Sequence, residues 1–144
     1  MLDKFKQLFG DIKSKETYVQ HSQLGKLRLD CHDNTWETVN SEVFFGGIPS
    51  VGGLPSEEVI REISEKLSNI DKYWAICSPD LELIVRDFAS MRNNLPAKEM
   101  FKVSAVSIYP GYWEICFESI EIYKWFCIGM QFEGEELVSN TIDT

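Results

Sequence analysis

The sequence lacks the motifs typical of common catalytic and metal-binding sites. Its four cysteines form no Cys-x-x-Cys pair, and the 144 residues include two histidines. Structural zinc sites take four Cys or His ligands at short spacings, so neither zinc binding nor a thioredoxin-like motif is encoded. The glycine-rich segment 46–53 lacks the Gly-Lys-Ser/Thr ending that a P-loop needs. We therefore predict no cofactor, no bound metal and no catalytic residue.

Long apolar runs are also missing. No stretch approaches the roughly 20 apolar residues of a membrane span. Residues 1–10 alternate charged and apolar side chains, without the unbroken apolar run of a secretory signal. We therefore expect a cytoplasmic chain that does not bind membranes and whose cysteines are free thiols.

Positive charge is scarce outside the first residues. Residues 1–28 carry six lysines or arginines and three acids, a net charge of +3, which leaves −12 for the rest of a chain whose total is −9. Such a field repels phosphate backbones and accelerates association with a basic partner. We therefore expect no nucleic-acid binding and a basic protein partner.

The length and composition indicate one globular domain spanning residues 1–144. Hydrophobic residues make up 44% of the chain and charged residues 26%, which is enough apolar content for a core. Leu2, Phe5, Leu8 and Phe9 fall at helical spacing, so segment 1–15 is predicted to hold a short amphipathic helix that packs on the domain. The sequence leaves open whether the protein is a monomer or a homodimer.

The first half of the chain predicts strands. Residues 18–21 and 26–30 flank a turn that contains Gly25, which suggests a hairpin. A strand is expected at 42–45, preceded by a short one around Trp36. We interpret the glycine-rich segment 46–53 as a connecting loop.

Two long helices are predicted to follow. Ser56 is a good N-cap, and the apolar stripe of the first helix runs from Val59 to Ile70. Ser78 and Pro79 resemble a second helix start, ending near Asn93. Residues 73–77 are predicted either to extend the first helix or to turn the corner.

Strands at 102–109, 112–117, 121–132 and 136–140 complete the prediction, joined by short turns that require antiparallel pairing. The expected fold is α+β, in the order strands, helix, helix, strands. Two main helices would pack on one face of an antiparallel sheet of about five to seven strands.

The alternation within the last strands predicts two different sheet faces. Trp113, Ile115, Phe117, Phe126, Ile128 and Met130 are assigned to the core under the helices. The opposite face would carry aromatic anchors among carboxylates, a composition that suits a basic protein partner. The partner-binding residues of this hypothesis are Glu114, Glu118, Glu121, Tyr123 and Trp125. The alternative is that the N-terminal helix or the glycine-rich segment covers this face.

Two other functions stay open. Glu114, Glu118 and Glu121 could form the paired carboxylates of a hydrolase-like enzyme, and Cys31 next to His32 is a weaker catalytic candidate because neighbours on a strand point apart. His21, the other histidine, could meet His32 across the hairpin. A housekeeping or ligand-binding domain would be favoured by an apolar cavity.

The order of sequence motifs along the chain is similar to that of a known group of domains. These motifs are the segment Leu24-Gly25-Lys26-Leu27-Arg28-Leu29-Asp30, then Trp36, two helices, and the hairpins Tyr109-Pro110-Gly111-Tyr112-Trp113-Glu114 and Glu121-Ile122-Tyr123. In the order of these motifs the chain resembles a group of small acidic bacterial domains. The resemblance spans roughly residues 18–140. Some members of that group are thought to be immunity proteins of polymorphic or contact-dependent toxin systems. The resemblance implies a non-enzymatic immunity protein that neutralises a basic toxin domain, and it carries over no site residue.

Overall fold

The computed structural model describes residues 16–88, 95–120 and 125–143. The helix expected within 1–15 lies outside this range, as do Glu121 and Tyr123. No helix in the described ranges is long and apolar enough to cross a membrane.

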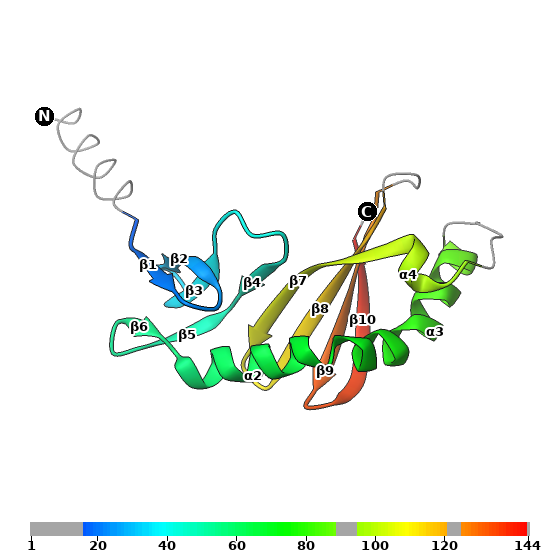
Figure 1. The fold of residues 1–144 in the computed structure, drawn as a ribbon. Helices are drawn as coiled ribbons and strands as arrows, with labels where there is room; N and C mark the ends of the chain where they lie inside the picture. The colour runs from blue at the N-terminus through cyan, green and yellow to red at the C-terminus, as the bar shows by residue number, and fades with distance from the viewer. Residues whose placement is uncertain (1–15, 89–94, 121–124, 144) are drawn as a thin grey trace, which may run out of the picture.

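The α+β class is confirmed, but the strands form two sheets instead of one. Across the described part of the chain, ten strands divide into five-stranded sheets ordered β1-β2-β3-β5-β6 and β10-β9-β8-β7-β4 (Figure 1). A short third helix, α4, precedes β7. The strands are β1 (Tyr18–His21), β2 (Gly25–Asp30), β3 (Thr35–Thr38), β4 (Phe44–Gly46), β5 (Ile48–Val51), β6 (Leu54–Pro55), β7 (Phe101–Tyr109), β8 (Tyr112–Ser119), β9 (Cys127–Glu133) and β10 (Glu136–Asp143). The helices are α2 (Glu57–Ser68), α3 (Ile70–Phe88) and α4 (Ala97–Met100).

The glycine-rich segment 46–53 is not the predicted connecting loop. Gly46 ends β4, and Ile48–Val51 forms β5, which pairs with β3 and with β6. Ile48 is fully buried opposite Trp36. Burial of this side chain favours a strand here, although the segment is rich in glycine. Gly52 and Gly53 form the tight turn between β5 and β6 with positive φ angles.

One strand of the second sheet runs against the expected antiparallel pattern. β4 pairs in parallel with β7, with Phe44 opposite Ala105 and Phe45 opposite Val106. At Gly47 the chain leaves this edge and enters β5 of the first sheet. Gly47 has a φ of +75°, and a Cβ added there would lie 2.0 Å from the carbonyl oxygen of Ile108. Only glycine lets the chain pass this close to β7 in this conformation.

Helix α2 begins as the sequence predicts. The Ser56 hydroxyl accepts a hydrogen bond from the Val59 amide at 3.3 Å, and two glutamates occupy the first turn. The helix ends earlier than its apolar stripe suggests. The Asn69 amide nitrogen and its side chain both donate to the Glu65 carbonyl, which closes α2 before Ile70 starts the next helix.

The predicted helix start at Ser78 and Pro79 is wrong. Both residues lie inside α3, where the Ser78 hydroxyl donates to the Trp74 carbonyl at 2.5 Å. Proline normally disfavours a helix interior because it lacks an N–H donor. Here Tyr73, Cys77 and Leu81 form a continuous buried stripe across the proline, so packing keeps the helix intact.

The core lies between α2, α3 and the sheets. Tyr73 of α3 meets Trp113 and Phe132 edge to face, with ring centroids 5.0 and 5.4 Å apart, and Trp74 meets Phe117 at 4.8 Å. The core prediction for the last strands is confirmed: each of the six assigned side chains is at most 5% exposed. These contacts leave the other face of the second sheet turned away from α3.

The Gly47 position supports a stability prediction. Gly47→Ala should lower the free energy of unfolding by about 2–4 kcal/mol, because it combines an unfavourable positive φ with a clash against backbone. Gly52→Ala is the matched control, since its φ is +61° but nothing lies within 4 Å of the added Cβ. That control should cost about 1 kcal/mol, from the φ angle alone. Equal losses in urea denaturation of the two variants would contradict the proposed close approach.

Candidate partner-binding surface

The face of the second sheet opposite the helices, which we call the open face, carries the predicted glutamates. Glu114, Cys116 and Glu118 alternate along β8 with buried core residues. The register places Gln131 opposite Glu114 and Cys127 opposite Glu118 on β9. All the side chains that the prediction assigned to this face and that the structure describes therefore share it.

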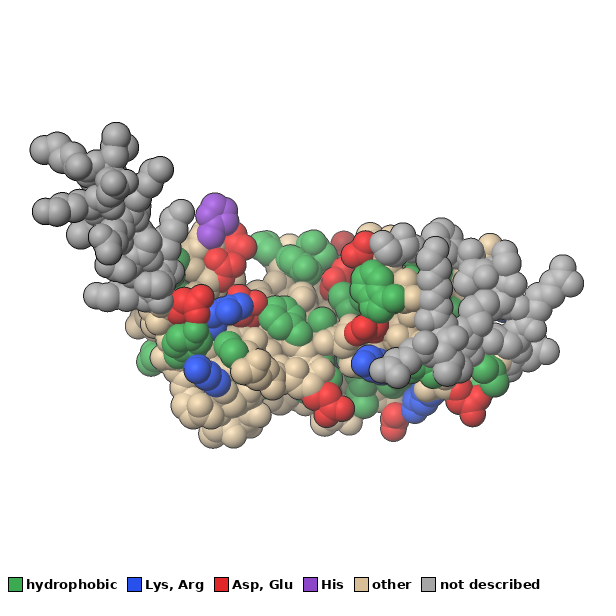
Figure 2. Space-filling view, turned by 90° about the horizontal axis from the view of Figure 1, so that it is seen from above, with side chains coloured by type: hydrophobic (Ala, Val, Ile, Leu, Met, Phe, Trp, Pro, Cys, Tyr) green, Lys and Arg blue, Asp and Glu red, His purple; other side chains and the backbone are tan. Residues whose placement is uncertain are grey.

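The glycine-rich segment does not cover the open face. Its first residue pairs at the sheet edge and the following residues belong to the first sheet. The view onto this side of the molecule shows carboxylates and hydrophobic side chains intermixed across its middle (Figure 2). Tyr109 and Tyr112 are each 40% exposed and Trp125 is 50% exposed. Trp125, which the sequence predicted to be either an exposed anchor or a covered side chain, is therefore accessible.

Trp125 and Glu118 form one pair on this surface. The indole Nε1 donates to Glu118 Oε1 at 2.9 Å. The bond orients the ring beside a carboxylate and leaves half of the ring exposed. Of the five hypothesised partner-binding residues, the structure brings these two into contact, while Glu121 and Tyr123 lie outside the described residues.

Glu114 belongs to a separate polar network that crosses three strands. Its carboxylate accepts hydrogen bonds from the Gln131 amide and from the Cys116 thiol, the latter at 3.2 Å. The Gln131 amide also donates to Thr141 on β10, and its oxygen accepts from Ser139 at 3.0 Å. Gln131 is 7% exposed, so the network is largely shielded from water. This shielding holds the Glu114 carboxylate in one position.

Glu114 and Glu118 lie in separate hydrogen-bonding environments along β8. Four residues along an extended strand separate their Cα atoms by roughly 13 Å. Each carboxylate is also committed to its own partner, Trp125 or Gln131. Paired acid and base catalysis usually needs carboxyl groups closer than about 10 Å around one substrate bond.

Two half-buried thiols lie beside these glutamates on the open face. Cys116 and Cys127 occupy neighbouring strands on the open face, offset by two residues in the register. A hydrogen bond from Cys116 lowers the pKa of Cys127, partly opposed by burial and assisted by a bond with Ser104. The same bond, with burial and Glu114, raises the pKa of Cys116. Cys127 is therefore the thiol of the pair that ionises first.

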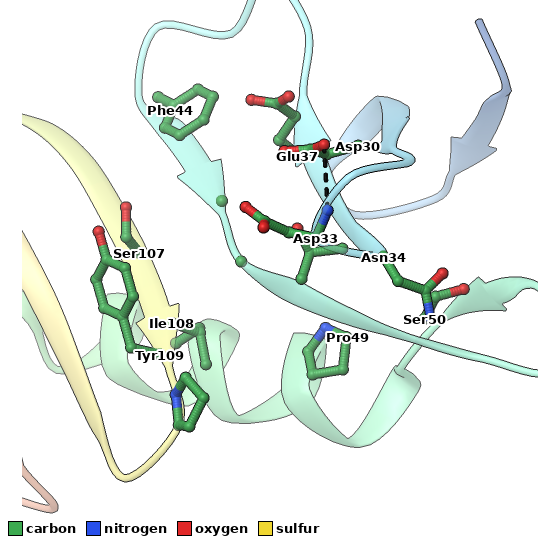
Figure 3. Close-up of a pocket in the computed structure, with 14 residues that line it drawn as sticks. Asp30, Asp33, Asn34, Glu37, Phe44, Pro49, Ser50, Ser107, Ile108 and Tyr109 are labelled. Carbon is green, nitrogen blue, oxygen red and sulfur yellow. Dashed lines mark hydrogen bonds between the residues drawn. The ribbon is translucent and has the colours of Figure 1, made fainter.

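A second feature, a cleft between the two sheets, could not be predicted from any local sequence pattern. It encloses about 700 Å³. Asp30, Asp33 and Glu37 line one side, on β2, β3 and the turn between them, and Phe44 and Tyr109 line the other (Figure 3). Asp30 Oδ1 accepts hydrogen bonds from the backbone amides of His32 and Asp33 at 3.0 and 3.4 Å, which shapes the turn. The parallel pairing of β4 with β7 brings the two sides together, and no local sequence pattern predicts that pairing.

A tyrosine pair separates this cleft from a hollow on the open face. The rings of Tyr109 and Tyr112 stack with centroids 4.7 Å apart and an interplanar angle of 13°. Burial and the charge of Glu114 raise the pKa of Tyr109. The hollow encloses about 580 Å³ and is lined by Glu114, Glu133 and Tyr112 among others. We call the cleft, the tyrosine pair, the hollow and the Glu118–Trp125 pair together the acidic–aromatic surface.

The Cys31-His32-Asp33 segment forms a turn, as predicted, and all three side chains are exposed. The hairpin register places His21 beside the β1–β2 turn, opposite Gly25, whereas His32 follows the far end of β2. The two histidines therefore do not meet. His21 instead binds the Glu57 carboxylate through Nε2 at 3.0 Å and accepts from the Gln23 amide through Nδ1.

Within residues 16–88, 95–120 and 125–143, no group of three or more His, Cys, Asp or Glu side chains could hold a metal ion. The fold and surface define a two-sheet α+β protein with an accessible acidic–aromatic surface. No protein-family model, curated protein or solved structure matches the chain.

The thiol pair supports a prediction about reactivity. The alkylation rate of Cys127 by iodoacetamide should reach its plateau at a lower pH in the folded chain than in urea, because a lowered pKa supplies thiolate at lower pH. Cys77 is the internal control: it is fully buried, burial raises its pKa to about 12, and it should react only after unfolding. Site-resolved mass spectrometry measures each rate. Faster alkylation of Cys116 than of Cys127 would contradict the assignment.

Proposed function

We propose that this protein is a non-enzymatic binding module that recognises a basic protein partner through its acidic–aromatic surface. The observation that carries the proposal is the placement of carboxylates on both sides of one exposed tyrosine pair. Asp30, Asp33 and Glu37 lie on the cleft side, and Glu114 and Glu133 on the other. This arrangement supports recognition of side chains that are both cationic and flat.

Arginine fits this chemistry best. Its guanidinium group stacks on aromatic rings and donates two parallel hydrogen bonds to a carboxylate. An arginine lying over Tyr109 or Tyr112 would have carboxylates within reach on either side. Cation–π contacts with tyrosine add roughly 0.5–2 kcal/mol, depending on how far water is excluded.

Of the carboxylates on this surface, only Glu37 forms an ion pair within the described residues. Arg28 forms an ion pair with Glu37 at 3.2 Å, at the edge of the cleft. Lys102 stands opposite Glu118 in the β7–β8 register, and no ion pair in the described part of the chain joins them. Glu114 is already positioned by Gln131, so its ordering costs little on binding. The net charge of −9 would also speed the encounter with a basic protein.

The finer proposal is a toxin-neutralising immunity protein that acts in the cytoplasm. The resemblance in landmark order and the charge of −12 beyond residue 28 support it. In this proposal the acidic–aromatic surface occludes a basic toxin domain. Steering by opposite charge gives the fast association that neutralising a toxin requires.

The cleft also favours a second candidate, binding of a small cationic ligand. Its volume of about 700 Å³ falls in the range of small-molecule sites. A small ligand would occupy the cleft alone, whereas a protein would also cover the hollow beyond the tyrosine pair. Substitutions on the two sides of the pair therefore distinguish the candidates.

The test uses the product of the neighbouring upstream gene as the binding partner. Asp33→Asn in the cleft and Glu114→Gln in the hollow should each weaken the complex at least tenfold in calorimetric titration, since each removes a charge from an arginine site. Raising the salt concentration should weaken the wild-type complex as well. Glu62→Gln, an exposed position on α2, removes the same charge elsewhere and should change the affinity less than threefold.

Two outcomes would overturn the partner proposal. One is the absence of a complex together with no protection of cells that express the upstream product. The other is an equal loss of affinity in the Glu114→Gln and Glu62→Gln variants. That result would mean that the affinity depends on net charge and not on the position of the carboxylate. Sensitivity to Asp33→Asn alone would favour the small-ligand candidate.

A further inference from the structure

Strand β10 presents an unpaired edge. It is the outermost strand of the second sheet and pairs with β9 on one side only. Within the described ranges, no backbone hydrogen bond reaches its other side. Seven of its eight residues are exposed. Such an edge offers a row of N–H and C=O groups to another extended chain.

The strand carries little of the protection that proteins usually place on sheet edges. It contains no proline and no lysine. Its register shifts once, between Leu137 and Ser139, which leaves Val138 as a bulge. From Ser139 to Asp143 the pairing with β9 is continuous, so five residues form a regular edge.

The two sides of this edge differ in chemistry. Ser139 and Thr141 line the hollow of the acidic–aromatic surface, and Asp143 follows on the same side. Ile142 lies opposite the buried Ile128, on the helix side. There it lines an apolar groove of about 260 Å³ with Leu83, Ile84 and Asp87.

Exposed side chains lie on both sides of the outer edge of β10. Ile142 is 38% exposed and Leu83 is 49% exposed. Asp87 and Asp143 are exposed carboxylates, and no ion pair joins either to another residue of the described segments. The edge thus offers carboxylates at Asp87 and Asp143 beside an apolar groove.

We propose that the outer edge of β10 docks an extended segment of the basic partner as a sixth strand of the second sheet. The inference rests on the proposed function for the identity of the partner. Side chains of the docked segment alternate: basic residues lie on the side of Asp143, and apolar residues enter the groove between Leu83 and Ile142. Backbone hydrogen bonds supply affinity, and the alternation supplies selectivity.

A second copy of this chain fits the edge poorly. In the antiparallel register that overlaps the whole strand, Ser139 pairs with Asn140 of the other copy, and Glu136 lies opposite Asp143 twice. Like charges directly opposite in a sheet are destabilising. Each copy also carries a net charge of −9. Charge complementarity therefore favours a basic segment.

The experiment uses the full chain, labelled with ¹⁵N, and a capped nine-residue peptide that alternates arginine and valine. Hydrogen exchange followed by NMR should show new protection at the alternate amides within Ser139–Asp143 that face away from β9. The same peptide with alternate backbone nitrogens methylated should bind at least tenfold more weakly, because it loses several hydrogen bonds worth about 1 kcal/mol each.

Variants test the two sides of the edge. Asp143→Asn should weaken the peptide about two- to fivefold through the lost charge pair. Leu83→Ser should weaken it about fivefold by removing one side of the apolar groove. Glu62→Gln should leave the peptide affinity unchanged.

Three results would overturn the proposal: no protection at Ser139–Asp143, equal binding of the methylated peptide, or protection that appears with protein concentration alone and reports self-association. Glu114→Gln separates this inference from the proposed function. If it weakens the upstream partner while the peptide protects no β10 amide, only the edge proposal fails. If the peptide protects β10 but the partner does not respond to Glu114→Gln, the proposed surface fails.

Discussion

The close contact between Gly47 and the carbonyl of Ile108 is the constraint on which the arrangement of the two sheets depends. It lets β4 pair in parallel with β7 and then release the chain into β5 of the first sheet. Any larger side chain would push the chain away from β7. The two sheets would then lose the alignment that places Asp33 across the cleft from Tyr109. A backbone contact within the lining of the cleft thus sets its charged side against its aromatic side.

The sequence predicted correctly those helix starts and strand faces that depend on residues close together in the chain. The Ser56 cap and the alternation along β8 and β9 require only neighbouring residues, and both appear in the structure. The predictions that were wrong concern segments whose conformation is decided by distant contacts. Pro79 lies inside a helix because the buried stripe of α3 continues past it, and the glycine-rich segment becomes strand because Ile48 fills the core beside Trp36.

The open-face part of the candidate surface was predictable from the sequence, because it depends on local alternation, whereas the cleft was not. Alternation placed Glu114, Glu118 and Trp125 on the face away from the helices, since a period of two is visible in sequence. The cleft carboxylates and the tyrosine pair could not be joined to them, because their proximity follows from the parallel pairing of β4. Within this surface Arg28 pairs with Glu37 in the cleft, but on the open face neutral partners, Gln131 and the Trp125 indole, position the carboxylates of Glu114 and Glu118. Carboxylates held in this way keep their charge available to an incoming cation.

The most direct measurement of the central claim is an NMR titration of the full chain with N-acetyl-arginine amide, with N-acetyl-citrulline amide as the neutral, nearly isosteric control. We expect saturable shifts at Tyr109, Tyr112 and the residues flanking Asp33 and Glu114, from the arginine compound only, and we expect these shifts to be lost at high salt. Shifts that spread evenly over all exposed carboxylates, or that citrulline reproduces, would contradict a built site for cationic side chains.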